Sequence, residues 1–216
     1  MIKINNVQVF GIEAAIRGMR NPKNSWDKSD SSTSSDDIIE LGPNDLKLAK
    51  ALHEGGPVHS KYKRMIHIQM DVDAPIYWWK EYDTYKVSTT ANSCSTMHKI
   101  HAYEINRDMF STDHLSEREL KTLDAIIVDL EYNRKKFLET NDKEYWYRLI
   151  QSLPMSFNQM RTLDFSYETG TNILMWRYNH KLDEWREFCK VLLSLPYAKE
   201  IMVPVVRREE IEKMYQ

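Results

Sequence analysis

One stretch of alternating residues constrains the fold of this 216-residue chain more than any other. Residues 66–73 read IHIQMDVD, and every second side chain is apolar: Ile66, Ile68, Met70 and Val72. A period of two places these side chains on one face of a β-strand and the polar ones on the other. A helix is excluded here because its period is 3.6 residues. We assign no chemistry to His67, which falls on the polar face.

Most of the other ordered segments have helical spacing. A strand is expected at residues 3–10, followed by a turn at Gly11, and residues 158–169 are also strand-like. Ser116 and Glu119 form a capping box, which predicts the start of a long helix. Further helices are expected at residues 14–16, 44–54 from a cap at Asn44 or Asp45, 75–86 from a cap at Asp73, 143–153, 172–178 and 182–195. The sequence therefore predicts an α+β fold, with a small central antiparallel sheet flanked by helices.

The length suits a single domain over residues 1–216. Residues 21–45 differ from the rest, because they are rich in Ser, Asp, Asn and Pro. This composition predicts a polar loop or insertion. A loop of this length is either a solvated, mobile segment or a lid over a binding site. Residues 87–96 are small and polar, and we expect a loop there too.

The net charge and the absence of targeting signals argue against nucleic acids and membranes as partners. The chain has 30 Lys and Arg against 32 Asp and Glu, a net charge of −2. Nucleic-acid binding is not expected, because it needs a clear cationic excess. The N-terminus lacks the apolar core of a secretory signal, and no run of residues is long and apolar enough to span a membrane. We expect a soluble cytoplasmic protein with no membrane partner.

Familiar catalytic motifs are absent from the sequence. It contains no GxGxxG, no P-loop, no GxSxG and no HExxH. His98 and His101 have a spacing that could join two imidazoles, but a zinc site needs a third protein ligand, so no metal is predicted. Cys94 has no sequence partner that would lower its thiol pKa and is interpreted as structural.

Two regions together resemble the flavin-dependent thymidylate synthases. That family reads P-I-F, two variable residues, R-Q-W-F-R-H-R, and then a loop S-x-N-E-x-S-x-R. Here Pro75-Ile76-Tyr77 matches the opening, Lys80-Glu81-Tyr82 stands at Arg-Gln-Trp, and Thr84-Tyr85-Lys86 stands at Arg-His-Arg. Residues 92–97, NSCSTM, stand at Asn-Glu-x-Ser-Gly-Arg.

The resemblance continues on both sides of these motifs. Upstream, residues 56–60, GPVHS, are similar to the family's G-H-x-S loop. Downstream, Leu153-Pro154 matches a Leu-Pro before a family strand. Asn172 and Arg177, five residues apart, match an Asn and an Arg on the following helix, and His180 with residues 183–185 loosely matches H-A-Q-W-E. In order, the resemblance covers residues 46–195.

The resemblance implies the family fold and its reaction. That reaction converts dUMP to dTMP with methylenetetrahydrofolate as one-carbon donor, reduced FAD as hydride source and NADPH as reductant of the flavin. It implies a homotetramer whose sites are shared between subunits. The implied nucleotide-binding residues are Arg177, Asn92, Ser95 and Thr96, and the implied flavin-binding residues are Lys86, Tyr85, Thr84, Asn172, His59 and Ser60. No catalytic residue is assigned.

Several family residues are replaced in this chain. Thr84 and Tyr85 stand in place of an Arg and a His, and Ser93 and Met97 in place of a Glu and an Arg. Arginine can hold a phosphate through two parallel hydrogen bonds, which methionine cannot. An alternative is therefore a non-catalytic nucleotide-binding protein of the same fold, of phage or mobile-element origin. A third reading is a structural protein that binds a partner.

Individual residues also have structural readings. Trp78 and Trp79 fit core or interface positions as well as ring stacking. Arg177 fits an ion pair with Glu168 or Asp183. The hydroxyl-rich residues 88–96 fit a hydrated loop as well as a phosphate site. On the ligand-binding reading, Lys86, Asn92, Ser95 and Arg177 should meet in one cleft, across subunits if need be.

Overall fold

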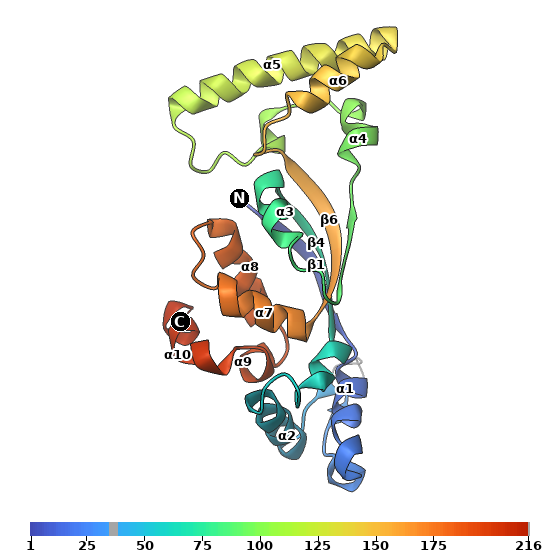
Figure 1. The fold of residues 1–216 in the computed structure, drawn as a ribbon, viewed down its shortest axis with the longest axis vertical. Coiled ribbons are helices and arrows are strands. Elements are labelled where there is room, and N and C mark those ends of the chain that lie inside the picture. Colours follow the sequence, from blue (N-terminus) through green and yellow to red (C-terminus); the bar gives the residue numbers. More distant parts are fainter. Residues whose placement is uncertain (35–38, 216) are drawn as a thin grey trace. The chain divides into compact units, whose positions relative to one another are not determined.

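The computed structural model describes residues 1–34 and 39–215, so part of the predicted 21–45 loop lies outside the described residues. Figure 1 shows an α+β chain. Its main sheet is antiparallel, with the strand order β1-β4-β6-β5. These strands are β1 (Lys3–Phe10), β4 (His67–Pro75), β5 (Thr89–Ser93) and β6 (Asn158–Ser166). A second, two-stranded sheet pairs β2 (Ser32–Thr33) with β3 (Ile39–Glu40). The predicted fold class is confirmed.

Helices make up most of the remaining described chain. They are α1 (Ile12–Met19), α2 (Pro43–Glu54), α3 (Ile76–Tyr82), α4 (Thr96–Lys99), α5 (Glu117–Thr140), α6 (Lys143–Gln151), α7 (Tyr167–Arg177), α8 (Asp183–Leu193), α9 (Ala198–Ile201) and α10 (Arg208–Met214). In the described residues, no helix is both long enough and apolar enough to cross a bilayer.

The alternation in β4 has the predicted consequence. Ile66, Ile68, Met70 and Val72 are all buried. On the other face, His67 Nδ1 lies 2.8 Å from Asp164 Oδ1, and Gln69 Nε2 donates to Asp164 Oδ2 at 2.8 Å. Asp164 belongs to β6, so the polar face of β4 is occupied by cross-strand pairs, as expected for side chains that are structural.

The described chain forms two compact units. The first comprises residues 1–5, 71–85 and 91–162, and the second comprises residues 6–70, 86–90 and 163–216. In the first, α5 and α6 pack around a core that includes Leu123, Leu130 and Leu149. The capping box at the start of α5 is present as predicted. Trp78 and Trp79 are fully buried in this unit, which confirms their core reading.

In the second unit, Gly11 permits a sharp change of direction between β1 and α1. Its φ is +84°, and a Cβ atom there would lie 2.2 Å from the carbonyl oxygen of Met65. An L-residue would therefore meet both backbone strain and a clash. The turn predicted at Gly11 is confirmed, and it brings α1 against residues 61–65.

Three local predictions were wrong. Residues 89–93 form β5 instead of a loop, because pairing with β6 satisfies backbone groups that local sequence leaves open. The N-cap position of α3 is occupied by Pro75 and not by Asp73, since β4 continues through Pro75, and no side chain caps this helix. Helix α7 begins at Tyr167, earlier than expected, because the Ser166 side chain accepts a hydrogen bond from the Thr169 N–H and caps it.

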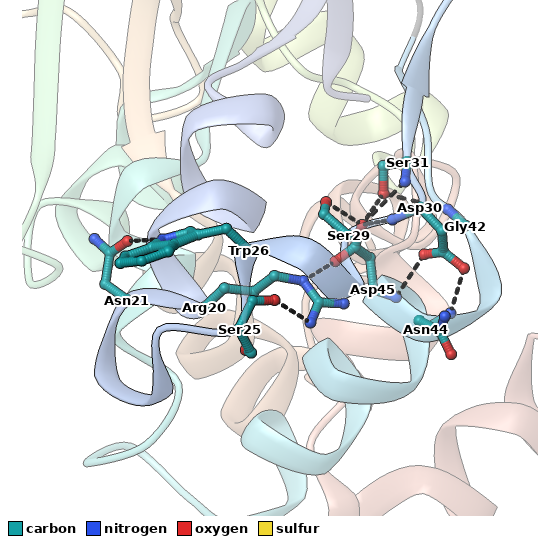
Figure 2. A network of polar contacts seen from close by, with 10 residues as sticks. All are labelled: Arg20, Asn21, Ser25, Trp26, Ser29, Asp30, Ser31, Gly42, Asn44 and Asp45. Carbon is teal, nitrogen blue, oxygen red and sulfur yellow. Dashed lines mark hydrogen bonds and ion pairs between the residues drawn. The ribbon is translucent and has the colours of Figure 1, made fainter.

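Asp45 has a different role from the predicted helix cap. Helix α2 begins at Pro43 after Gly42, and the buried carboxylate of Asp45 instead gathers the preceding loop (Figure 2). It accepts hydrogen bonds from the N–H groups of Asp30 and Ser31 and from the hydroxyls of Ser29 and Ser31, and it pairs with Arg20 Nε at 2.6 Å. The Asp30 carboxylate, in turn, accepts from the N–H groups of Asn44 and Asp45 at the start of α2.

This network fixes the protonation state of Asp45. Burial would raise the pKa of its carboxyl group, but hydrogen bonds from Ser31, Ser29 and Arg20 outweigh that effect and lower the pKa to about 2. A carboxyl with a lowered pKa stabilises the fold above its unfolded pKa of about 3.9, and the contribution is lost as pH falls toward 2.

We predict that Asp45→Asn destabilises the protein by about 3 kcal/mol at pH 7, because it leaves the buried Arg20 guanidinium without its counter-ion. Urea unfolding at pH 7 and pH 3 measures this, and the difference from wild type should shrink at pH 3. Asp27→Asn, at an exposed position of the same loop, is the matched control. An equal effect of the two substitutions would contradict a special role for Asp45.

Candidate functional site

A pocket of about 570 Å³ lies within the second unit. It is bordered by the end of α2, the segment from Gly56 to Arg64, helix α7 and residues 204–206. The volume lies within the range typical of small-molecule sites. Its lining residues are His53, Glu54, Gly56, Pro57, Ser60, Lys63, Arg64, Glu168, Thr171, Asn172, Met175, Pro204, Val205 and Val206. We refer to it as the α2–α7 pocket.

Two of the predicted flavin-binding residues line this pocket. Ser60 is buried, and its hydroxyl donates to the Gly56 carbonyl oxygen at 3.1 Å. Asn172 is exposed on α7. The two residues are 112 positions apart in sequence, so their shared pocket is a product of the fold.

The pocket also contains a buried lysine that no sequence motif indicates. Lys63 is 3% exposed, and its ammonium group lies 3.1 Å from His53 Nδ1 and 3.1 Å from Thr171 Oγ1. These partners come from α2 and α7. The lysine side chain therefore joins two of the elements that border the α2–α7 pocket.

The hydrogen bonds of His53 define its tautomer. His53 Nε2 lies 2.8 Å from the carbonyl oxygen of Val203, so Nε2 carries the proton and donates. Nδ1 is then an acceptor for the Lys63 ammonium. Burial lowers the pKa of His53, and the neighbouring Lys63 charge lowers it further. His53 is thus a neutral ring that orients Lys63.

Lys63 differs in its charge environment from the other ionic groups of the pocket. Glu168 Oε2 accepts from Arg64 Nε at 2.7 Å, and Glu54 lies 3.4 Å from Arg208. Lys63 has two neutral partners instead. Burial lowers the pKa of its ammonium group to about 8, and the Glu168 charge offsets only part of that effect.

The predicted flavin-binding residues near the family motif fall in two places. Thr84 is exposed and its hydroxyl donates to the Glu81 carbonyl oxygen at 2.7 Å. Thr84 and Tyr85 belong to the first unit and Lys86 to the second. His59 is exposed and lines a separate cavity of about 420 Å³ in the second unit, away from the α2–α7 pocket lining.

The backbone next to Lys86 is attached to the start of α7. The Val87 carbonyl oxygen accepts from Thr169 Oγ1 at 2.9 Å, and the Ser88 carbonyl oxygen accepts from the Ser166 N–H at 3.3 Å. Helix α7 also carries Asn172 and Arg177. The segment from Lys86 to Thr90 and this helix therefore form one connected part of the second unit.

Arg177 ends α7 and its guanidinium lies over the Trp185 ring, 4.9 Å from the ring centroid. Trp185 is fully buried, so this cation–π contact holds the arginine against the core. Of its two predicted ion-pair partners, Glu168 is paired with Arg64, and an ion pair with Asp183 stays a prediction. The cation–π contact gives Arg177 a structural role whether or not it also binds a ligand.

The predicted nucleotide-binding residues Asn92, Ser95 and Thr96 lie in the first unit. Asn92 is exposed on β5. Ser95 caps α4 by accepting from the His98 N–H, and Thr96 Oγ1 accepts from Gln159 Nε2 at 3.0 Å. Ser95 and Thr96 line a cavity of only about 120 Å³, which is smaller than a nucleotide site needs. A common cleft with Lys86 and Arg177 stays a prediction.

The sequence contained a weak signal for the residues that were missed. Asp45, Ala49 and His53 are the buried positions of α2, whereas Leu46, Leu48 and Leu52 on the same helix are only half-buried. Their spacing of four residues defines a helix face, but two of the three are polar. A search for polar residues at helical spacing would have found His53. Lys63 has no such pattern.

Comparison with solved structures identifies the fold class as that of the flavin-dependent thymidylate synthases. Thymidylate synthase X (ThyX) from Helicobacter pylori, solved with FAD and dUMP, matches over 100% of both chains with a TM-score of 0.67 at 15% identity. A second ThyX complex from the same organism matches 98% of this chain and 100% of its own, with a TM-score of 0.63 at 16% identity.

A related enzyme shares the fold. The UMP/dUMP methylase PolB from Streptomyces cacaoi, bound to 5-Br dUMP, has a TM-score of 0.58 at 12% identity and matches 100% of this chain and 95% of its own. No family model matches the sequence, and no curated protein matches it either. At these identities the likeness establishes the fold, and the fold expected from the motif resemblance is confirmed.

We predict that stability rises by about 1–2 kcal/mol between pH 8 and pH 9.5 because of Lys63. Its pKa is lowered from 10.5 to about 8 on folding, so the unfolded chain binds more protons in this window. Urea unfolding at both pH values measures the change, and Lys63→Met should lack it. The same rise in the variant would show that Lys63 is not its source. Exposed Lys61→Met is the control.

Proposed function

We propose that this protein binds a pyrimidine nucleotide such as dUMP together with FAD, in the manner of a flavin-dependent thymidylate synthase. The observation that carries the proposal is the α2–α7 pocket on this fold: Ser60 and Asn172, expected at the flavin from sequence motifs alone, line one pocket of about 570 Å³. Full-length similarity to ThyX bound to FAD and dUMP supports the same choice of ligands.

The residues present fit a flavin nucleotide in part. Asn172 offers an amide to a ring or ribose, and the segment beginning at Lys86 is tied to the same helix. Under the proposal, Lys86, Tyr85, Thr84, Asn172, His59 and Ser60 surround the flavin. Arg177, Asn92, Ser95 and Thr96 contact the nucleotide.

The enzymatic form of the proposal is methyl transfer to dUMP, with methylenetetrahydrofolate as the one-carbon donor and NADPH as reductant. FAD would supply the hydride chemistry, and this chain would bind and orient the reactants. Asn172 and Arg177 both lie on α7, about 140° apart around the helix axis, so they would contact different parts of the ligands. We also propose a cytoplasmic location, consistent with the free thiols of Cys94 and Cys189.

The proposal includes a homotetramer. The proposed ligand residues fall in both units of the chain, with Asn92, Ser95 and Thr96 in the first and Asn172 and Arg177 in the second. A shared site would allow residues of one subunit to complete the site of another. Light scattering tests this, and a species of only 25.7 kDa at micromolar concentration would contradict the shared-site form of the proposal.

The second candidate is a nucleotide-binding protein without catalysis, of phage or mobile-element origin. The residue replacements favour it: Thr84 and Tyr85 occupy positions where the family motif has an Arg and a His. The hydroxyls of Ser95 and Thr96 are also engaged in local hydrogen bonds. A protein of this kind would bind a nucleotide but would neither bind FAD nor convert the nucleotide.

Flavin binding separates the two candidates. We predict that the purified protein, saturated with FAD and freed of excess, retains the visible absorbance of oxidised flavin. Asn172→Ala should reduce the retained flavin severalfold, because the amide is lost from the pocket. Asn179→Ala, at an exposed position beyond α7, is the matched control. A colourless protein that still binds dUMP would support the non-catalytic candidate.

Nucleotide binding tests the role of Arg177. We predict that Arg177→Ala weakens dUMP binding by about 1.5–3 kcal/mol, the usual contribution of a hydrogen bond to a charged group. Calorimetry against dUMP, with dTMP as a second ligand, measures the effect. Arg118→Ala, on the exposed surface of α5, should bind as wild type. Unchanged binding in the Arg177 variant would contradict a role of this residue in nucleotide binding.

A further inference from the structure

Lys63 is a buried cation in the lining of the α2–α7 pocket that neither the motifs nor the proposed function accounts for. Its ammonium group has three N–H donors, and among the described residues His53 and Thr171 are its hydrogen-bond partners. A third donor is therefore available at a group that lines a pocket of about 570 Å³.

The charges around the pocket leave Lys63 without a paired counter-ion. The carboxylate of Glu168 is held by Arg64, and that of Glu54 by Arg208. Within the described residues, no carboxylate lies within ion-pair distance of Lys63 Nζ. A buried charge is costly unless it is paired. An anionic ligand would supply the missing charge.

The neighbours of Lys63 are arranged to orient it without neutralising it. His53 donates through Nε2 to the Val203 carbonyl oxygen and accepts from Lys63 through Nδ1. Thr171 Oγ1 lies 2.9 Å from the Tyr167 carbonyl oxygen, to which it donates, so it too accepts from Lys63. Both partners use acceptor atoms, and both leave the positive charge of the ammonium group intact.

We propose that Lys63 is an anion-binding residue of the α2–α7 pocket and that it holds the phosphate group of a phosphorylated ligand, oriented by His53 and Thr171. A lysine ammonium is a compact point charge that suits a phosphate. Asn172 lines the same pocket and offers its amide N–H donors to the ligand. Lys63 thus supplies a cation in a chain where Thr84 and Tyr85 replace an Arg and a His of the family motif.

The side chain of Glu168 favours a phosphorylated organic ligand over inorganic phosphate. Glu168 Oε1 is buried and has no hydrogen-bond partner among the described residues, although Oε2 is paired with Arg64. Glu168 lines the same pocket. A carboxylate oxygen accepts hydrogen bonds only, so it fits a ligand hydroxyl or N–H and not a phosphate oxygen. A nucleotide carries both kinds of group.

This inference deepens the proposed function and rests on it for the identity of the ligand, but phosphate binding at Lys63 can be tested without FAD or dUMP. Inorganic pyrophosphate is the first probe, and lysine labelled with ¹³C at the ε position reports on Lys63. The Lys63 resonance is assigned by its absence from Lys63→Met. Its pKa should increase by at least one unit on adding pyrophosphate, because the anion stabilises the charged form.

Direct binding measurements use the same variants. Lys63→Met should bind pyrophosphate at least tenfold more weakly than wild type, and Lys61→Met should bind as wild type because Lys61 is exposed and lines a different cavity. Circular dichroism shows whether each variant is folded. His53→Ala provides a second test that keeps Lys63: the ammonium group loses its orienting acceptor, and pyrophosphate binding should weaken.

Comparison of ligands with and without phosphate shows whether Lys63 binds the phosphate of FAD or that of dUMP. The affinity for FAD is compared with that for riboflavin, and the affinity for dUMP with that for deoxyuridine. If the phosphate of FAD or dUMP contacts Lys63, Lys63→Met should remove most of the difference in affinity between that ligand and its counterpart without phosphate. Pyrophosphate binding that depends on Lys63, with neither FAD nor dUMP bound, would support this inference and contradict the proposed function. Binding of FAD and dUMP that is indifferent to Lys63→Met, with no change in the Lys63 resonance, would overturn this inference alone.

Discussion

The contact between Lys63 and His53 determines how the α2–α7 pocket is built. It links the segment after α2 to α2 itself, and the lysine then reaches Thr171 on α7 while His53 reaches Val203. Four stretches of sequence therefore converge on two side chains. The contact is stable only while His53 is neutral, and burial beside a cation keeps it so by lowering its pKa.

Part of the fold could be predicted from the sequence because its signals are local. The period of two in β4, the capping box of α5 and the left-handed turn at Gly11 are each fixed by neighbouring residues. Strand β5 was missed because its residues are small and polar, and it is a strand only through pairing with β6. The role of Asp45 was also mispredicted because it depends on contacts between residues distant in sequence: its partners Ser29 and Ser31 lie 16 and 14 residues before it.

The candidate site was predictable only where sequence motifs carry it. Ser60 and Asn172 were found by resemblance, and the fold brings both to the α2–α7 pocket. Lys63 was not found, because a lysine in the sequence KYKRM has the composition of an exposed turn. Its burial follows from packing between α7 and the segment from Lys61 to Met65, a contact between residues about a hundred positions apart. Local sequence patterns do not predict contacts between residues so far apart.

The position of the cation has consequences for the chemistry that this fold can support. An arginine on an exposed loop is always charged and can hold phosphate through two parallel bonds. Lys63 is buried, and its ammonium group, with a pKa of about 8, is partly deprotonated just above neutral pH. An anion bound to it must restore the proton, so binding would weaken as pH rises through 8. If Lys63 holds a phosphate as proposed, the charge of this site depends on pH and on the bound ligand, whereas an arginine would keep its charge throughout.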